Sequence, residues 1–218
     1  ETGEMEREPE STALFNRISP IYGLFFAYQK KRYAATLEQM HHLLGSRILD
    51  VGCGTGALCS ALADRKLEVT GVEPAARMLE VARKKTKGQT ITFIQADATN
   101  RLPFADKQFD ISIASYVAHG MEQKKRFALY HEMSRVTGSR VIIHDYNANR
   151  NPFTSLIEYL ERGDYFHFIK HAQTEMQECT NELRRCFSQV EVLQVGKRAN
   201  WYICTPNPKP TDTDPSQA

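Results

Sequence analysis

The 218-residue sequence lacks any long uninterrupted run of apolar residues, and it lacks a strong charge of either sign. No stretch approaches the roughly 18 apolar residues that a membrane span requires. The 28 basic and 26 acidic side chains nearly balance, which leaves a formal net charge of +2. Nucleic-acid-binding domains usually carry a clustered basic face, which this composition does not favour. We therefore expect neither a membrane nor a nucleic acid as a partner.

Cysteine is present, but not in the spacings that bind zinc or build a disulfide framework. The five cysteines form an odd set that contains no Cys-x-x-Cys pair. This usage predicts free thiols in a reducing compartment, which we take to be the cytoplasm, and it predicts no metal site. The sequence does not specify an oligomeric state.

Apolar stretches of two different periods alternate along the chain. Short, β-branched runs that suit buried strands are followed by segments with helical spacing. The strand-like runs cover residues 47–52, 68–73, 91–97, 109–115, 140–146, 190–195 and 200–205. Repeated βα units of this length predict an α/β fold with a mostly parallel sheet of about seven strands, helices on both faces and an antiparallel last pair.

Changes in composition along the chain predict its domain organisation. Residues 1–45 begin as an acidic, polar tail and continue as a helix-prone segment, which we expect to form a helical cap at the carboxyl ends of the strands. Residues 46–205 form the main domain, with a mainly helical lid inserted at about 151–187. Residues 206–218 are rich in proline and short polar residues, and such a segment does not order by itself.

Three glycines, Gly52, Gly54 and Gly56, directly follow the first strand and precede a helix. Glycine weakens both strands and helices, so three at alternate positions indicate a tight turn or the close approach of a ligand. The amides and dipole at the start of the following helix favour an anionic group. Two ligands fit, namely a dinucleotide through its pyrophosphate or an adenosyl amino acid through its carboxylate.

The dinucleotide alternative stays open on the loop alone, because residues 52–57 fit Gly-x-Gly-x-x-Ala and Glu73 follows about 20 residues later. Three further features favour the adenosyl amino acid. Asp50 lies inside the end of the first strand, where a dinucleotide-binding fold normally keeps an apolar residue. Asp97 closes the third strand, where a carboxylate can bind an adenine amino group. The stretch "LPFADKQFD" then leads directly into the fourth strand.

The stretches "ILDVGCGTG", "GVEPAARMLEVARK", "QADATNRLPFADKQFDISIAS" and "HEMSRV" resemble successive motifs of the class I S-adenosylmethionine-dependent methyltransferases. The resemblance covers roughly residues 48–146 and is to the methyltransferase type 11 group, which includes ubiquinone and menaquinone biosynthesis enzymes. It implies a Rossmann-like sheet and S-adenosylmethionine as the cofactor. The chain departs from the family after "HEMSRV", where "TGSR" replaces the usual "LKPGG" turn.

The resemblance also implies roles for individual residues. The backbone of the glycine loop would admit the methionine part of the cofactor, and Asp50 would support that pocket. Glu73 would accept both ribose hydroxyls, a bidentate role that suits a carboxylate. The other expected cofactor contacts are Pro74 and Met78 beside the ribose and adenine, Asp97 and Ala98 at the adenine edge, Ser115 and Tyr116 at the methionine side, and Arg17 and Tyr22 from the N-terminal segment.

Some of these residues have simpler structural interpretations. Asp97 would also serve to cap the turn that follows it, and Met78 would also serve as core filler. Cys53 is interpreted as a small packing residue rather than a reactive thiol, although it lies inside the glycine loop.

Methyl transfer from a sulfonium is an in-line displacement, so holding the reactants in place supplies much of the catalysis. A general base is needed only where the acceptor is protonated at neutral pH. The candidate catalytic residues are His119 after the fourth strand and Asp145 and Tyr146 at the end of the fifth, and His144 is a further candidate base.

Aromatic residues on both sides of the sheet segment either enclose an apolar small-molecule acceptor or simply pack their helices together. They are Phe15, Tyr22, Phe25, Phe26, Tyr33, Tyr159, Tyr165, Phe166 and Phe168. The predicted function is methyl transfer to a small molecule. The alternatives are a cofactor-binding protein without turnover, an NAD-dependent oxidoreductase and, least supported, a nucleic-acid methyltransferase.

Overall fold

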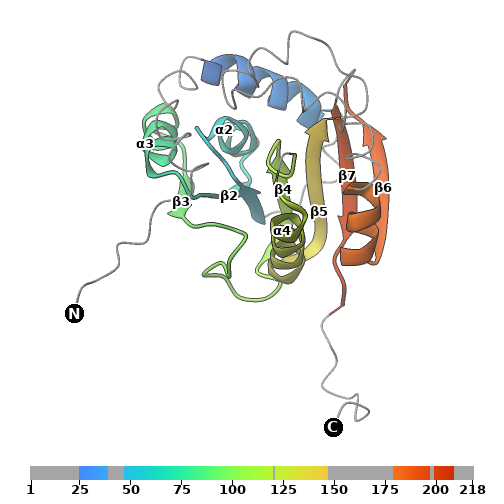
Figure 1. Cartoon of the computed structure of the whole chain (residues 1–218). Coiled ribbons are helices and arrows are strands. Elements are labelled where there is room, and N and C mark those ends of the chain that lie inside the picture. The colour runs from blue at the N-terminus through green and yellow to red at the C-terminus, as the bar shows by residue number, and fades with distance from the viewer. Residues whose placement is uncertain (1–24, 39–46, 120, 147–178, 197–198, 209–218) are drawn as a thin grey trace, which may run out of the picture.

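The computed structural model describes residues 25–38, 47–119, 121–146, 179–196 and 199–208 (Figure 1). Seven strands form one open sheet in the order β3-β2-β1-β4-β5-β7-β6. The strands are β1 (Arg47–Val51), β2 (Glu68–Glu73), β3 (Ile91–Gln95), β4 (Phe109–Ser115), β5 (Thr137–Tyr146), β6 (Gln189–Gln194) and β7 (Ala199–Thr205). The helices are α2 (Ala57–Ala63), α3 (Ala76–Lys85) and α4 (Gln123–Val136), with two more over residues 25–38 and 179–186.

The predicted fold class is confirmed. The first five strands run parallel to one another, and β7 pairs antiparallel with both β5 and β6. The expected bounds of β2 and β4 match the structure. The expected bounds of β3 are wrong at one end: the strand ends at Gln95, so Asp97 follows the strand instead of closing it. The strand β5 begins three residues earlier than expected, because α4 ends at Val136 and passes into the strand without a turn. The residues "TGSR" are therefore the first part of β5 rather than a connection to it.

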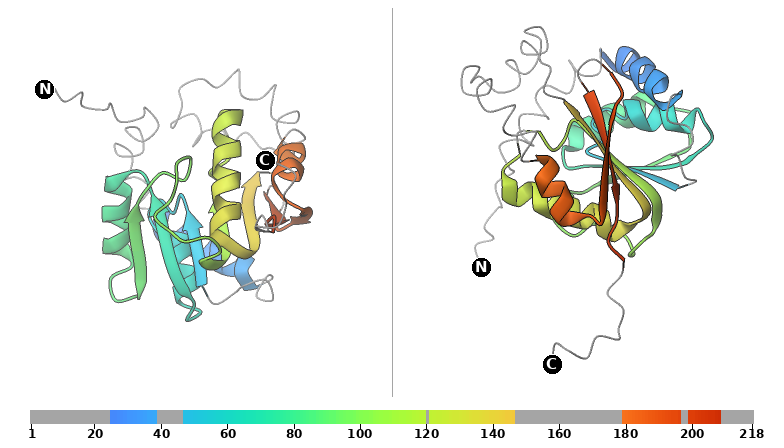
Figure 2. Two further views of the ribbon diagram at one scale, coloured as in Figure 1. Left: turned by 90° about the horizontal axis from the view of Figure 1, so that it is seen from below. Right: turned by 90° about the vertical axis from the view of Figure 1, so that its right-hand side faces the viewer.

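Each face of the sheet is covered by its own layer of helices (Figure 2). One hydrophobic cluster joins the helix 25–38, α2 and α3 to side chains such as Ile48 and Ile142. The other joins α4 and the helix 179–186 to the opposite face, where Leu49 and Ile143 lie. Because successive strand residues point to opposite faces, each carboxyl-terminal residue of a strand belongs to a definite side of the sheet.

The helix 25–38 packs across one face of the sheet beside α2. Its Leu37 is fully buried in the cluster on that face, and the Arg65 guanidinium donates to the Ala34 carbonyl at 2.9 Å. Tyr33 lies near the end of β5, with its ring centroid 6.0 Å from that of His144. The remainder of the predicted cap, residues 1–24 and 39–46, lies outside the described residues, so covering of the strand ends by this segment stays a prediction.

A buried ion pair joins the helix 179–186 to α4. The Arg126 guanidinium donates from Nε to Glu182 Oε2 at 2.7 Å and from Nη2 to Glu182 Oε1 at 2.8 Å, while Gln123 Nε2 donates to Oε1 at 2.9 Å. Arg126 also donates to the Met121 carbonyl. These bonds fix the end of the predicted helical insertion. Its first part, residues 151–178, lies outside the described residues.

Replacing one partner of this pair should destabilise the protein strongly. We expect Glu182→Ala to lower the free energy of unfolding by about 3 kcal/mol, because it leaves a buried guanidinium without its counter-charge. Urea denaturation followed by circular dichroism measures the change. Lys30→Ala, which removes the partly exposed pair with Asp64 at 2.7 Å, is the control and should stay within about 0.5 kcal/mol of the wild type. Equal losses in the two variants would contradict a structural role for the buried pair.

Candidate cofactor and acceptor site

The glycine loop after β1 contains both a tight turn and an open approach. All three glycines have left-handed backbones, with φ values of 69° at Gly52, 51° at Gly54 and 78° at Gly56. A Cβ at Gly52 would lie 2.6 Å from Val117 Cγ2, and one at Gly56 would lie 3.1 Å from the Ala82 Cβ. At Gly54, by contrast, no described atom comes within 4 Å of the Cβ position. Gly52 and Gly56 thus allow neighbouring side chains of the protein to pack closely against the loop, and Gly54 leaves space for a ligand.

Glu73 ties the glycine loop to the start of α3. Its Oε2 accepts from the Gly54 amide at 3.0 Å, and its Oε1 accepts from the Ala75 amide at 3.0 Å. Burial raises the pKa of the Glu73 carboxyl above its usual range, against the effect of these two bonds. Each oxygen retains a lone pair, since a carboxylate has about four acceptor positions. The arrangement is compatible with the ribose contact that the resemblance implies, and that contact stays a prediction.

Asp50 lies beneath the same loop and is 1% exposed. Its Oδ2 accepts a hydrogen bond from the Cys59 thiol at 3.1 Å. Burial raises the pKa of Asp50 to about 7, the thiol bond partly offsets this, and the nearby Glu73 charge adds to it. A cation bound above Asp50 would favour the ionised form of this carboxyl group, and the attraction between the two charges would stabilise the bound cation. Cys53 is itself buried in the core, as its interpretation as a packing residue required.

The expected adenine side is built from the loops after β2 and β3. Asp97 Oδ1 accepts from the Thr99 amide at 2.9 Å and from the Thr99 hydroxyl at 2.8 Å, so this residue does cap the turn that follows it. Ala98 is buried against the core, and Met78 is 2% exposed, which suits its interpretation as core filler. The Pro74 carbonyl accepts from Gln95 Nε2 at 3.0 Å, a contact that the sequence did not indicate.

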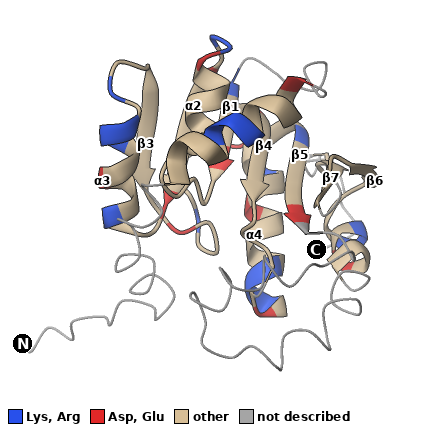
Figure 3. Cartoon of the chain, turned by 90° about the horizontal axis from the view of Figure 1, so that it is seen from above, with Lys and Arg blue, Asp and Glu red and all other residues tan. Residues whose placement is uncertain are grey.

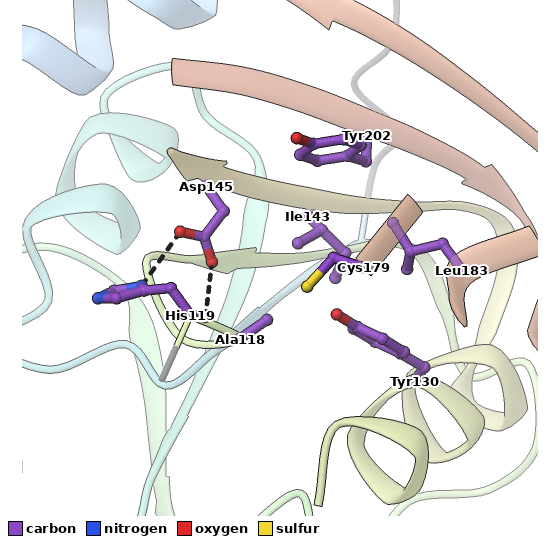
Figure 4. A pocket seen from close by; sticks show the side chains of 8 residues that line it. All are labelled: Ala118, His119, Tyr130, Ile143, Asp145, Cys179, Leu183 and Tyr202. Carbon is purple, nitrogen blue, oxygen red and sulfur yellow. Dashed lines mark hydrogen bonds and ion pairs between the residues drawn. The ribbon is translucent and has the colours of Figure 1, made fainter. Parts of the chain in front are cut away.

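The expected acceptor edge brings His119 and Asp145 together (Figure 4). The His119 amide donates to Asp145 Oδ2 at 3.0 Å, and His119 Nδ1 lies 3.1 Å from Asp145 Oδ1. A hydrogen on Nδ1 then leaves the Nε2 lone pair to act as a base. Figure 4 shows the imidazole pointing away from a small, mainly apolar cavity that Tyr130 and Tyr202 help to line. Tyr146 is the last residue of β5, and its side chain lies outside what the structure describes.

Ser115 and Tyr116 meet His144 on the other face of the sheet. The Ser115 hydroxyl lies 3.3 Å from His144 Nδ1, and the Tyr116 hydroxyl lies 3.5 Å from His144 Nε2. Burial lowers the pKa of His144 to about 4, which keeps its ring neutral. Because both ring nitrogens face hydroxyl groups and the ring is buried, His144 does not fit the role of general base that its sequence position allowed.

The structure settles the position of some of the other expected site residues. Of the flanking aromatic residues, Tyr33 lies against His144, Phe26 is buried and Phe25 is half exposed. Arg17 and Tyr22 lie outside the described residues, as do the other aromatic candidates. Val117 was not foreseen as part of the site, because its contact with Gly52 joins two turns that are far apart in the sequence. No group of three potential metal ligands occurs among the described residues, and none of the described helices is long and apolar enough to cross a membrane.

The buried Asp50 carboxyl should make stability depend on pH in a defined direction. Its raised pKa means that the folded protein holds this proton more tightly than the unfolded chain does, so ionisation between about pH 4 and pH 7 removes stability as the pH rises. We compare the free energy of unfolding of Asp50→Asn with that of the wild type at each pH. The difference should shift in favour of the variant by about 2–3 kcal/mol between pH 5 and pH 8. Urea titrations at the two pH values test this, and a constant difference between the two proteins would contradict it.

Comparison with known proteins identifies relatives of this chain. The methyltransferase domain family matches residues 48–139. The demethylmenaquinone methyltransferase of Renibacterium salmoninarum is 32% identical over 168 residues, which cover 72% of this chain and 68% of that protein. The enzyme of the same name from Paenarthrobacter aurescens is 30% identical over 172 residues, which cover 73% of this chain and 65% of its own length. The chain thus spans about two thirds of each of these relatives.

Solved structures share the fold at lower sequence identity. An S-adenosylmethionine-dependent methyltransferase from Thermotoga maritima aligns with a TM-score of 0.65 at 20% identity, covering 91% of this chain and 100% of that one. The magnesium protoporphyrin IX methyltransferase of Synechocystis, solved with bound SAH, aligns with a TM-score of 0.58 at 20% identity, covering 83% of both chains. Together with the sequence relatives, these findings show that the chain belongs to the class I S-adenosylmethionine-dependent methyltransferases, whose cofactor is S-adenosylmethionine.

Proposed function

We propose that this protein transfers the methyl group of S-adenosylmethionine to a small-molecule acceptor. The observation that carries the proposal is that the glycine loop and the His119–Asp145 pair meet at one edge of the sheet. Val117, two residues before His119, packs directly on Gly52 in the loop. A cofactor that enters at Gly54 and an acceptor beside His119 would therefore lie next to each other, as an in-line displacement requires.

The residues around the loop fit the cofactor. The methionine part would lie at the open side of Gly54, with Asp50 below it and Ser115 and Tyr116 beside it. Glu73 would receive the ribose hydroxyls, and the loop after β3 would face the adenine. We propose the same cofactor contacts as those expected from the sequence: Asp50, Gly52, Gly54, Gly56, Glu73, Pro74, Met78, Asp97, Ala98, Ser115 and Tyr116, with Arg17 and Tyr22 from the N-terminal segment. When bound, the cofactor supplies an activated methyl group on a sulfonium.

His119 would act as the general base. Asp145 accepts a hydrogen bond from the His119 amide, and its Oδ1 lies 3.1 Å from Nδ1. With the ring proton on Nδ1, Nε2 would carry the lone pair that takes the proton of the acceptor. The acceptor atom then forms its bond to the methyl carbon while the sulfur–carbon bond breaks and its electron pair stays on sulfur. Tyr146, at the end of β5, is proposed as a further contact of the acceptor.

The sequence relatives suggest which acceptor to test first. They are named demethylmenaquinone methyltransferases, and this name supports an aromatic, quinone-like ring as the acceptor. The reduced form of such a ring carries phenolic protons, which give a general base a task. A naphthohydroquinone without the ring methyl group is therefore the first acceptor that we would test.

We also propose that the protein works in the cytoplasm without a nucleic-acid partner. All five cysteines are free thiols, which suits a reducing compartment. Lys and Arg residues are spread over α3, α4 and the helix 25–38 and are interspersed with acidic residues (Figure 3). Such a distribution supports solvated helix surfaces rather than a polyanion-binding face.

Calorimetric titration with S-adenosylmethionine and, separately, with NADH tests the cofactor site. We expect micromolar binding of S-adenosylmethionine only, abolished by Glu73→Ala and weakened by Asp97→Ala. Gly54→Ala should weaken binding by at least about tenfold, since its Cβ enters the space left for the ligand.

Gly88→Ala is the matched control for that variant. Gly88 also has a left-handed backbone, with φ 93°, and open space around its Cβ position, but it lies at the far end of α3. It should lose similar stability and keep its affinity for S-adenosylmethionine within about twofold. Tighter binding of NADH by the wild type would overturn the proposed function in favour of an oxidoreductase.

Turnover is tested with the naphthohydroquinone by measuring S-adenosylhomocysteine formation. We expect His119→Ala to lower kcat by about 10²–10⁴-fold and to leave the affinity for S-adenosylmethionine nearly unchanged, because only proton transfer is lost. Asp145→Asn should lower kcat less, since the ring remains but loses its fixed orientation. An unchanged kcat in His119→Ala would exclude the base, and cofactor binding without turnover of any acceptor would favour a binding protein.

A further inference from the structure

We propose that His144 is a positioning residue of this site: it holds Tyr116 in a left-handed conformation that places Val117 on the glycine loop and His119 on Asp145. The inference rests on the proposed function, because it assigns the role of His144 through the cofactor loop and the catalytic base. It gives His144 a role different from that of its neighbour Asp145, whose side chain contacts His119 on the opposite face of the sheet.

The conformation of Tyr116 is the first observation. Its φ of 58° lies in the left-handed region, which costs a tyrosine of the order of 1–3 kcal/mol and persists only where the surroundings enforce it. Three contacts of Tyr116 are to His144. The Tyr116 amide donates to the His144 carbonyl at 2.8 Å, the Tyr116 hydroxyl lies 3.5 Å from Nε2, and the two ring centroids are 4.8 Å apart.

The second observation is that His144 is itself held rigidly. The residue is 5% exposed, and its ring centroid lies 6.0 Å from that of Tyr33 and 6.1 Å from that of Trp201. Burial lowers its pKa to about 4, so the imidazole is neutral and offers one donor and one acceptor nitrogen. The hydroxyls of Ser115 and Tyr116 suit either tautomer. This is the environment of a fixed support and not of a proton carrier.

The third observation is that the turn at Tyr116 positions the two residues of the site that follow it, Val117 and His119. The next residue, Val117, fills the space at Gly52, where a Cβ would lie 2.6 Å from its Cγ2. Two residues later, the amide and Nδ1 of His119 both meet Asp145. Two consecutive residues of β5, His144 and Asp145, therefore fix the two ends of the segment 116–119 from opposite faces of the sheet.

A double-mutant cycle with Tyr116→Gly tests the proposal. Glycine adopts a positive φ without strain, so in the Tyr116→Gly background the segment no longer needs His144 to hold its turn. We expect His144→Phe alone to lower kcat with the naphthohydroquinone by about tenfold or more, and His144→Phe in the Tyr116→Gly background to lower it by less than about threefold. His144→Gln, which keeps an amide near the position of Nε2, should recover most of the loss.

Ile142→Val is the matched control, since Ile142 lies two residues earlier on the same strand and face and is buried in the same cluster as Trp201. It should lower the melting temperature without lowering kcat. Ring-nitrogen NMR of His119 gives a readout that needs no acceptor: we expect a single Nδ1–H tautomer in the wild type and a mixture of tautomers in His144→Phe.

The possible results separate the two proposals. A wild type that does not bind S-adenosylmethionine overturns the proposed function. A functional wild type whose kcat and His119 tautomer are unaffected by His144→Phe overturns the positioning role alone. Equal losses from His144→Phe in the wild-type and Tyr116→Gly backgrounds would also overturn it, because the effect would then not pass through the turn at Tyr116.

Discussion

The packing of Val117 against Gly52 is the contact on which the site depends. One turn follows β1 and carries the glycine loop, and the other follows β4 and carries His119. A side chain at residue 52 would lie 2.6 Å from the Val117 methyl group, so the two turns approach each other only because that residue is glycine. The left-handed backbone of Tyr116 brings Val117 to this place. The cofactor loop and the acceptor edge thus share one contact, and a change in either turn reaches the other.

Buried carboxylates at the carboxyl ends of three strands form the polar part of this edge. Glu73 accepts from two backbone amides, and Asp145 meets both the amide and the imidazole of His119. Asp50 accepts from the Cys59 thiol, a weak donor, and its pKa is raised to about 7. Burying a carboxylate is costly unless donors satisfy it. Of the three carboxylates, Asp50 would therefore be stabilised most by a cationic group of the cofactor. This agrees with its proposed place beneath the methionine part.

The agreement between the expected and observed strands follows from how local the signals are. The strands β2 and β4 are short apolar runs bounded by polar residues, and both have the expected bounds. The early start of β5 could not be predicted in this way, because "TGSR" has the composition of a turn. In the structure Thr137 pairs with Phe109 on the neighbouring strand, and the register shifts before the next pair, Ile111 with Arg140. Pairing with a neighbouring strand outweighs the local preference there.

The sequence by itself determined the order of the elements along the chain, the glycine loop and the acidic residues at or just after the ends of the first three strands, because each of these is encoded in consecutive residues. Only the tertiary structure decided the surroundings of the two candidate histidines. His119 follows β4 and His144 lies near the end of β5, and both were candidate bases in the sequence. In the structure, burial among aromatic rings keeps His144 neutral, whereas His119 lies against Asp145. That difference depends on which face of the sheet each residue meets and on what covers that face. Such contacts join residues far apart along the chain, so no local pattern encodes them.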